Sequence, residues 1–432
     1  MRVSEAPHLF AAGAAVSVMA CCLVAVQLYA GALEQQYVRA LAPATTRLPA
    51  KSHALAIQRK AFAQADLLPV YGSSELIIAS THDADRLFAD FPTGFRPFAV
   101  ASAAATPIIL TLRLGSLGTA IQGKRVVISI TPPEFYRPSN EQPSYNANFS
   151  RVQATALTFS REIPYALRRA AARRMLQYPA TIANDPILRW GVEALADESP
   201  VGTVRYAAVL PLGLLQRAVL DLCEHWQFVA FVHRHPELHG SESAVPARID
   251  WPSLESDAAS DAANRSSNNP FGLDGNYWLT NATRLQHANG GRSAKKPLLV
   301  ISLMAKGLRR EPRSLEWQDF ALLLDIVQAL GGKPLVVSAP FPGPFYDYWG
   351  MTAAERGRYY AQVRAITSRD HIPLVDFSEH DGERGFVRDA QEHLTDKGWV
   401  QYDEVFDAFF HGATVPGVRP STGLPAPSSL PN

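Results

Sequence analysis

A pair of serines follows a short apolar run in the first quarter of the chain, where the sequence reads Tyr71-Gly72-Ser73-Ser74-Glu75-Leu76. Where a buried strand turns into a helix, a serine hydroxyl is exposed at the carboxyl edge of the sheet, and free N–H groups at the helix N-terminus stabilise negative charge. The run is not the GxSxG elbow of α/β-hydrolases. The alternative is that Ser73 or Ser74 only caps the helix, with Glu75 in its first turn.

An aspartate and a histidine lie close together near the other end of the chain, at Asp389 and His393. A serine hydroxyl is a poor nucleophile at neutral pH, so it needs a base, usually histidine, and the histidine needs a carboxylate to orient it. The chain order Ser, Asp, His meets this requirement. The alternative is a surface histidine beside solvated charges.

Two further polar clusters carry weaker signals. The segment His233-Arg234-His235-Pro236-Glu237-Leu238-His239 contains imidazoles that suit zinc or copper. Because its proline breaks any helix and no second cluster matches it, we expect a plain loop there. A predicted helix carries four arginines that could hold phosphates of a polymer or anionic headgroups, or simply form a solvated basic face: Arg168, Arg169, Arg173 and Arg174.

The elements that must position these side chains are short apolar runs that alternate with longer helical segments. Such runs, several with Gly or Pro at their ends, are typical of buried parallel strands. We predict strands over residues 67–71, 98–101, 125–130, 298–302, 334–338 and 373–376. The clearest helix lies over 317–330. Strand–helix alternation predicts an α/β fold with a parallel sheet flanked by helices.

The middle of the chain, about residues 150–295, departs from this alternation. Two helices are predicted there, each with a proline at or near its start: 161–178 with Pro164 and 212–232 with Pro211. We interpret this region as a largely helical insertion in the α/β domain. Within it, the Ser-, Ala-, Asp- and Asn-rich stretch 240–269 is expected to be a long surface loop.

Composition limits the classes of function. The chain has 432 residues, and 41 Lys and Arg against 40 Asp and Glu give a net charge of +1. General nucleic-acid binders usually carry a strong basic excess, so no nucleic acid is expected as a partner. Apolar residues make up 47% of the chain, which argues against disorder throughout. The proline-rich residues 412–432 contain no acidic side chain and are expected to be disordered.

One segment, residues 9–33, has no charged side chain. A helix of about 20 apolar residues crosses a bilayer core of about 30 Å. We therefore expect a transmembrane signal anchor after a short cytoplasmic N-terminus (1–8), with the bulk of the chain (34–411) outside the cytoplasm. The alternatives are a signal peptide cleaved near Ala30-Gly31-Ala32, a lipoprotein signal at Cys21, and an apolar core helix.

The two chemical motifs together resemble the DltD family, the membrane-anchored proteins of the teichoic-acid D-alanylation system. The resemblance rests on two segments. The first is the Gly-Ser-Ser-Glu-Leu block at 72–76, and the second is the C-terminal region that contains Asp389 and the run His-Leu-x-x-x-Gly-Trp at 393–399. Further landmarks are similar to family elements and occur in the same order: Thr131-Pro132-Pro133-Glu134-Phe135, Asn268-Asn269-Pro270-Phe271-Gly272, Ser314-Leu315-Glu316-Trp317-Gln318-Asp319 and Phe345-Tyr346-Asp347-Tyr348-Trp349-Gly350. With the anchor, the resemblance covers about residues 9–410.

The resemblance implies an SGNH-hydrolase-like (flavodoxin-like) fold. It also implies Ser74 as nucleophile, His393 as base and Asp389 as the partner of that base, with no cofactor or metal. The family usually has Asp-x-x-His, whereas one more residue separates Asp389 from His393 in this chain. The extra residue changes the face that Asp389 presents, so Glu392 or Asp376 could orient the histidine instead.

Two other positions depart from the family pattern. Glu134 stands where the family has Trp, and the glycine-containing turn after the second strand reads Ala101-Ser102-Ala103. Backbone N–H groups of alanine can also form an oxyanion hole, so the second departure is compatible with acyl chemistry.

The function that the resemblance implies is a membrane-anchored, extracytoplasmic, serine-dependent acyl (D-alanyl) transferase or esterase acting on an envelope glycopolymer such as teichoic acid. The implied partners are a membrane O-acyltransferase, a D-alanyl carrier protein, the anionic glycopolymer and the membrane. One alternative is a non-catalytic anchored protein that presents carrier or acceptor to the O-acyltransferase. Another is a plain esterase or O-acetyl transferase on a related scaffold.

Overall fold

The centre of the protein is a parallel β-sheet. The computed structural model describes residues 7–43, 51–135, 141–236, 247–265, 271–273, 314–348 and 350–419. Within them the sheet has five strands in the order β2-β1-β3-β4-β5, and every pairing is parallel. The strands are β1 (Leu67–Gly72), β2 (Arg96–Ala101), β3 (Arg125–Ile130), β4 (Lys333–Ser338) and β5 (Leu374–Val375). They confirm five of the predicted runs, and the sixth, 298–302, lies outside the described residues.

Burial explains why these runs form strands. β1 is buried at every position, and β3 and β4 are buried at every position except the first. A parallel sheet that is covered on both faces needs apolar side chains along the whole strand. The chain runs from β1 to β2 on one side and then returns to place β3 on the other side of β1. In an open α/β sheet, ligands bind at the carboxyl ends of the strands where the order reverses in this way.

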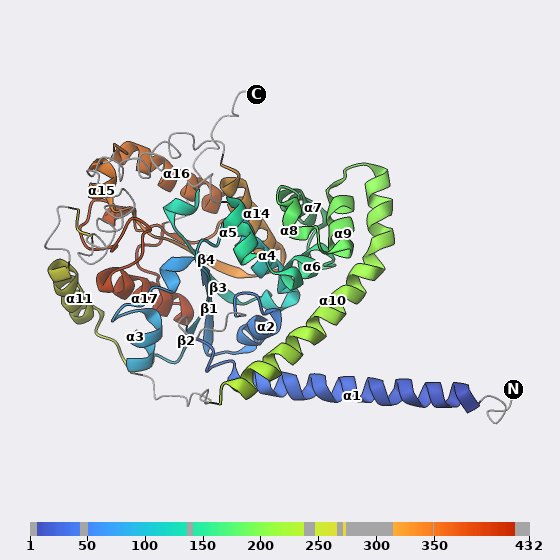
Figure 1. The fold of residues 1–432 in the computed structure, drawn as a ribbon. Coiled ribbons are helices and arrows are strands. Elements are labelled where there is room, and N and C mark those ends of the chain that lie inside the picture. Colours follow the sequence, from blue (N-terminus) through green and yellow to red (C-terminus); the bar gives the residue numbers. More distant parts are fainter. Residues whose placement is uncertain are drawn as a thin grey trace, which may run out of the picture.

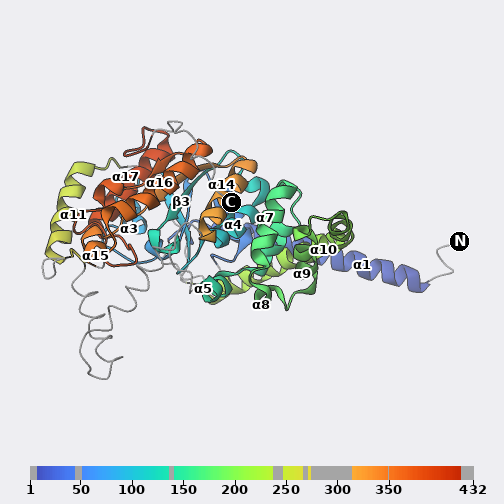
Figure 2. The same ribbon diagram turned by 90° about the horizontal axis from the view of Figure 1, so that it is seen from above.

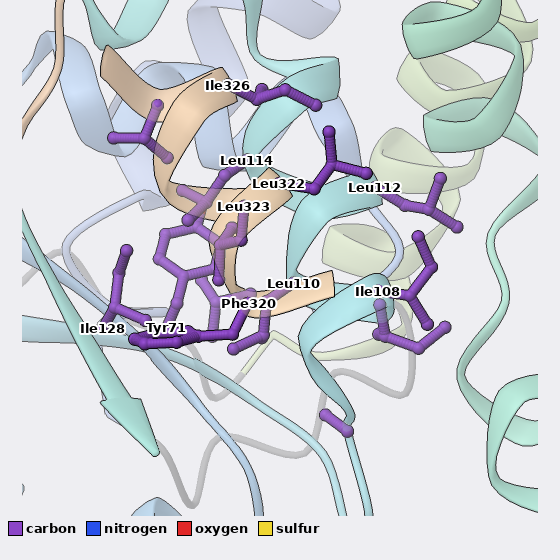
Figure 3. Close-up of a cluster of buried hydrophobic side chains, with 14 of the residues drawn as sticks. Tyr71, Ile108, Leu110, Leu112, Leu114, Ile128, Phe320, Leu322, Leu323 and Ile326 are labelled. Atoms are coloured by element: carbon purple, nitrogen blue, oxygen red, sulfur yellow. The ribbon is translucent and has the colours of Figure 1, made fainter. Parts of the chain in front are cut away.

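Helices cover both faces of the sheet (Figure 1). On one face, side chains such as Tyr71, Ile128 and Val336 pack against one set of helices: α2 (Leu55–Ala63), α4 (Pro107–Ser116), α14 (Leu315–Ala329) and α16 (Ala353–Arg369). Figure 3 shows Ile108 and Leu110 of α4 and Phe320 and Leu323 of α14 in this cluster. On the other face, strand residues pack against α3 (Ala84–Asp90) and α17 (Asp396–His411).

A group of helices lies beside α4, where a helical region was predicted. Its members are α5 (Glu141–Asn148), α6 (Arg151–Thr158), α7 (Tyr165–Met175), α8 (Pro179–Ile182), α9 (Pro186–Ala196) and α10 (Pro200–Arg234). Pro164 is the N-cap of α7, as predicted. Pro211, however, lies inside α10, which begins eleven residues earlier than this proline, at Pro200, with Ser199 as its N-cap. An internal proline removes one helical hydrogen bond, and α10 is bent (Figure 1).

The prediction of a loop over 240–269 is wrong for its central part, because Trp251–Arg265 forms α11. α11 packs against α17. Its Ala258 and Ala262 are buried, and its Leu254 is partly buried against the apolar cluster to which α17 contributes. These three residues recur at every fourth position, which gives one apolar stripe on an otherwise polar helix. Residues 247–250 form neither helix nor strand, as predicted, and 240–246 and 266–269 lie outside the described residues.

The expectation of a disordered tail does not hold for its first residues, 412–419. The backbone N–H of Arg419 donates to the carbonyl of Leu374 in β5 at 2.8 Å. The Arg419 guanidinium pairs with Asp376 at 3.1 Å and with Glu379 at 2.7 Å. This part of the tail is therefore held against the edge of the sheet, and residues 420–432 lie outside the described range.

The N-terminal helix α1 (Pro7–Tyr37) is a candidate membrane anchor. It projects from the rest of the protein in both views (Figures 1 and 2), and its apolar side chains are exposed, with Phe10 at 67% and Leu28 at 71%. This exposure contradicts the alternative of a buried core helix. Within the described residues α10 is also long and apolar enough to cross a membrane. It packs against α9, α2 and the end of α1, and its Glu224 accepts a hydrogen bond from the Leu55 N–H at 2.8 Å.

Candidate functional site

The serine pair lies at the carboxyl edge of the sheet, directly after β1. The predicted helix after it is much shorter than expected, because Ser74–Leu76 forms only a 3₁₀ turn, η2. The Ser73 side chain makes no capping hydrogen bond, so the alternative of Ser73 as a helix cap is wrong. Gly72 is needed for a close approach, since a Cβ there would lie 2.3 Å from Oε1 of Glu75. The turn thus folds tightly over the Glu75 carboxylate and exposes Ser74 at the edge of the sheet.

Ser74 and His393, which are far apart in the sequence, are in hydrogen-bond contact. His393 Nε2 lies 2.9 Å from Ser74 Oγ, and His393 Nδ1 lies 2.6 Å from Asp389 Oδ2. A carboxylate only accepts hydrogen bonds, so Nδ1 carries the proton and Nε2 is left to accept the serine proton. The geometry therefore fits a serine nucleophile, a histidine base and an orienting aspartate.

The loop that carries His393 is fixed on both sides. Val387 and Leu394 form an antiparallel bridge, and the Arg388 N–H donates to the carbonyl of His393 at 2.7 Å. Thr395, which follows Leu394, is the N-cap of α17, and its side chain accepts a hydrogen bond from the N–H of Gly398. A loop held in this way places the imidazole in one orientation over the end of β1.

Asp389 is the carboxylate that contacts His393, although the spacing differs from the family pattern. Its Oδ1 accepts from the N–H groups of Gln391 at 3.0 Å and His393 at 3.2 Å, while Oδ2 faces the imidazole. The extra residue is accommodated because Glu392 adopts a left-handed backbone conformation with φ 57°. Only a few per cent of non-glycine residues have a positive φ, so spacing alone did not indicate this solution.

The two rival carboxylates are used elsewhere. Glu392 is fully buried and accepts a hydrogen bond from the Tyr346 hydroxyl at 3.0 Å. Asp376 pairs with Arg364 at 2.5 Å and with Arg419 at 3.1 Å. Despite burial, its pKa is held below the usual range by Arg364 and by hydrogen bonds from Ser378. The structure does not bring either of them to His393.

A cavity of about 80 Å³ opens beside Ser74. Its lining is Ser73, Ser74, Ala104, Thr106, Thr131, Pro133, Glu134, Ser144, Glu316 and Gln391. A single water needs only about 10–15 Å³ of such volume, so the space has room for a small chemical group. Its position next to the serine hydroxyl makes it the candidate site for a reacting group.

The turn after β2 forms one wall of this cavity. Ala104 has φ 57°, so an alanine holds the left-handed conformation for which glycine would be the usual choice. Asn148 Nδ2 donates to the carbonyl of Ala103 at 3.0 Å, and Arg113 Nη2 donates to Ser102 Oγ at 2.6 Å. The sequence interpretation missed both supporting residues. Arg113 had a signal, since it is the lone charge in the apolar segment of α4, where it is fully buried.

Two buried carboxylates lie at the Ser74 turn. Glu75 is fully buried and accepts from the Ser73 N–H at 3.0 and 3.1 Å, and burial raises its pKa. Burial also raises the pKa of Glu134 well above its usual range, and the nearby charge of Glu75 raises it further. Glu134 was noted in the sequence only as a departure from the family.

The four arginines of the predicted helix divide between the protein interior and the surface. Arg174 is buried and pairs with Asp319 at 2.7 Å and with Glu316 at 3.3 Å. Arg168 is also buried and donates to the Tyr206 hydroxyl. The remaining two, Arg169 and Arg173, face Glu198. α7 packs against α9 and α14, so Arg168 and Arg174 are used in helix packing, whereas Arg173 lies on the surface.

The histidine-rich segment begins at the end of α10, where His233 lies in the last turn and His235 is the C-cap. Residues 237–246 lie outside the described range. Among the described residues, no group of three or more His, Cys, Asp or Glu side chains is placed to hold a metal ion.

Comparisons with known proteins identify the family. The family model described as DltD protein matches residues 44–411. Protein DltD of Bacillus subtilis (strain 168) is 25% identical over 371 residues, which cover 85% of this chain and 88% of that protein. Protein DltD of Staphylococcus aureus (strain NCTC 8325 / PS 47) is 22% identical, with 84% and 85% covered, and Protein DltD of Lacticaseibacillus rhamnosus is 20% identical, with 82% and 79% covered. The matched range includes the whole sheet and the site beside Ser74, and the chain belongs to the DltD family.

Proposed function

We propose that this protein is a serine-dependent acyl transferase that acts in the D-alanylation of a cell-envelope glycopolymer such as teichoic acid. The observation that carries the proposal is the chain of contacts from Ser74 Oγ to His393 Nε2 at 2.9 Å and from His393 Nδ1 to Asp389 at 2.6 Å. Family membership supplies the D-alanylation context. A nucleophile after the first strand and a base directly before the last helix of a parallel α/β sheet also support an SGNH-hydrolase-like fold.

The first half of the reaction forms an acyl-enzyme. His393 Nε2 takes the proton of the Ser74 hydroxyl as Oγ attacks the carbonyl carbon of a D-alanyl ester or thioester. Asp389 stabilises the imidazolium that results. The tetrahedral intermediate then collapses, and the leaving alcohol or thiol takes the proton from His393. The D-alanyl group remains on Ser74 as an ester.

The second half transfers the group. A hydroxyl of the glycopolymer gives its proton to His393 and attacks the acyl-enzyme carbonyl, and Ser74 recovers the proton as it leaves. Water in place of the polymer hydroxyl gives hydrolysis, so esterase activity is the side reaction. Backbone N–H groups at Ser74 and in the turn at Ala104, which both line the cavity, are the proposed oxyanion donors.

The location follows from α1. We propose that α1 is retained as a single-pass anchor and holds residues 34–411 on the extracytoplasmic side, with 1–8 in the cytoplasm. The proposed partners are the D-alanyl carrier protein, a membrane O-acyltransferase that delivers the acyl group, and the anionic glycopolymer that accepts it. Exposed apolar side chains along α1 support its contact with lipid.

The proposal is tested by covalent labelling with a fluorophosphonate, which reacts with activated serines. We expect the full-length protein in detergent to be labelled, and Ser74→Ala and His393→Ala to lose labelling. Ser253→Ala changes an exposed serine on α11 and serves as the matched control that stays labelled. Undiminished labelling of Ser74→Ala would exclude this serine as the nucleophile.

Complementation of a deletion strain separates catalysis from presentation. Ser74→Ala and His393→Ala are expected to leave the envelope without D-alanyl esters, whereas Ser253→Ala restores them. If both site variants restored D-alanylation, the protein would be a non-catalytic presenter of carrier or acceptor. Comparing hydrolysis of acetyl and D-alanyl esters by the purified protein separates a plain esterase from the proposed enzyme.

A further inference from the structure

The cavity beside Ser74 has an acidic lining without a compensating cation. Among the described residues that line it, Glu134 and Glu316 are ionisable acids, and none is Lys, Arg or His. The Glu316 carboxylate is tied to Arg174 from behind, at 3.3 Å. Glu134 therefore carries the acidic character of the cavity beside the serine.

The Glu134 carboxyl group is shielded from water and has no cation beside it. Both of its oxygens are buried, and neither has a well-aligned hydrogen-bond donor among the described residues. Weak hydrogen bonding from the Ser73 side chain and the Thr131 backbone lowers its pKa, but burial raises the pKa by more. An isolated buried carboxylate is costly, so such a group stays protonated until a cation arrives.

The position of Glu134 is fixed by its neighbours. It belongs to η4 (Pro132–Phe135), which follows β3 at the carboxyl edge of the sheet. The next residue, Phe135, stacks on Trp317 with ring centroids 4.2 Å apart and contacts Phe320 edge-on at 5.9 Å. The packing of Phe135 holds the turn, and Glu134 lines the cavity, so a cation that pairs with this carboxyl group would enter the cavity.

We propose that Glu134 binds the ammonium group of the acyl group that is transferred, so that the cavity selects a small α-aminoacyl substrate. This inference rests on the proposed acyl transfer at Ser74. An α-ammonium is separated from the reacting carbonyl by a single carbon, so the group that holds it must share the cavity with Ser74 Oγ, as Glu134 does. The volume of about 80 Å³ has room for an alanyl-sized group.

The ammonium also changes the charge state of the site. When it enters, Glu134 releases its proton to solvent and pairs with the ammonium through a charge-assisted hydrogen bond. A neutral acyl group of the same shape leaves the carboxyl group without a partner and is bound less well. Glu134 is therefore a specificity-determining residue and takes no part in proton transfer with Ser74.

Binding to a protein that cannot react tests this inference separately from catalysis. In the Ser74→Ala background of the full chain, D-alanine methyl ester and its neutral isostere methyl isobutyrate are titrated and followed by ligand-observed NMR. Adding Glu134→Gln, which keeps the shape of the neutral acid, is expected to weaken binding of the D-alanine ester about tenfold or more. Binding of methyl isobutyrate is expected to stay within about twofold.

The matched control is Asp403→Asn on α17. Asp403 is also fully buried, its oxygens accept no hydrogen bond from described residues, and burial raises its pKa, but it is not in the cavity lining. It is expected to leave both affinities unchanged. Equal affinity of the D-alanine ester for Glu134→Gln and for its parent would overturn the inference, and so would an equal loss with Asp403→Asn.

A kinetic experiment distinguishes failure of the inference from failure of the proposed function. With Ser74 intact, Glu134→Gln is expected to lower kcat/KM for a D-alanyl thioester about tenfold relative to that for an acetyl thioester. Absence of labelling in the unmodified protein would remove the proposed function, whereas normal labelling with an unchanged ratio of D-alanyl to acetyl turnover in Glu134→Gln would remove only the role of Glu134.

Discussion

The protein buries ionisable side chains in two neighbouring regions. In one of them the charge is compensated by partners of opposite sign, and in the other it is not. Between α7 and α14, Arg174 is 5% exposed, and Asp319 and Glu316 compensate its charge at 2.7 and 3.3 Å. In the cavity beside Ser74, the oxygens of Glu134 are buried, and the charges that act on them are those of other carboxylates, Glu75 and Glu316. Glu316 belongs to both regions, because it pairs with Arg174 and also lines the cavity.

The difference separates a structural use of buried charge from a functional one. A paired buried cation is a fixed part of helix packing, and removing one partner leaves the other uncompensated. An unpaired buried carboxyl group weakens the fold and is retained where a ligand completes it. The two regions are therefore expected to respond oppositely to mutation, the first by losing stability and the second by losing selectivity.

The largest effect on activity is expected at Asp389, which faces the imidazole that becomes positively charged during the reaction. Asp389→Asn should keep the shape of the loop but lower acyl transfer by about 10³- to 10⁴-fold, roughly 4–5.5 kcal/mol in activation free energy, because an amide cannot hold the imidazole in the required tautomer. Turnover of a D-alanyl thioester measures the loss. Glu392→Gln, within the same loop, serves as the comparison and should lose far less. A similar loss in both variants would mean that Asp389 is not the orienting carboxylate.

Removing the compensated cation should cost stability. Arg174→Met leaves Asp319 and Glu316 buried without their partner and is expected to lower the free energy of unfolding by about 3–5 kcal/mol. Urea denaturation followed by circular dichroism measures it. The neighbouring Arg173, which pairs with Glu198 in solvent, is the control, and Arg173→Met should change stability by less than about 1 kcal/mol. An equal loss of stability in the two variants would mean that the buried pair of Arg174 stabilises the fold no more than the exposed pair of Arg173.

Much of the fold could be predicted from local sequence because burial dictates it. β1 and β3 are continuous apolar runs, and runs of this kind suit a covered parallel sheet. β2 extends two residues beyond its predicted start, because Arg96 pairs in register with Leu67 of β1. α11 was missed since its Ser- and Asp-rich composition hides an alanine stripe that becomes apolar only against α17.

The candidate site was predictable in its residue types but not in its details. The resemblance named Ser74, His393 and Asp389, and the structure places these three side chains in contact. The spacing left the orienting carboxylate open, because the backbone of Glu392 is set by burial and its contact with Tyr346. The protonation of Glu134 depends on its burial and on the groups that the fold places around it, and no local sequence pattern indicates these.

The raised pKa of Glu134 should make the free energy of unfolding depend on pH. In the folded protein the pKa of Glu134 is raised, so the unfolded chain releases this proton first as pH rises. The stability of the wild type then falls as pH increases above the unfolded value, by about 1.4 kcal/mol for each unit of difference in pKa. Glu134→Gln should remove this part of the fall and be more stable than the wild type at pH 8 but not at pH 4. Urea midpoints at the two pH values test it, and parallel curves would show that Glu134 has a partner.

The smallest effect is expected in the backbone of the cavity wall. Ala104 has φ 57°, where a side chain costs an L-residue about 1–2 kcal/mol, and glycine is free of this cost. After the greater entropy of glycine in the unfolded chain is subtracted, Ala104→Gly should stabilise the protein by up to about 1 kcal/mol. The same exchange at the exposed helical position Ala361 in α16 should instead destabilise it by about 1 kcal/mol, so thermal melting of the two variants should shift in opposite directions. Opposite shifts mean that the cavity wall carries strain which the helices do not, whereas a loss of stability in both variants would mean that the Ala104 turn is relaxed.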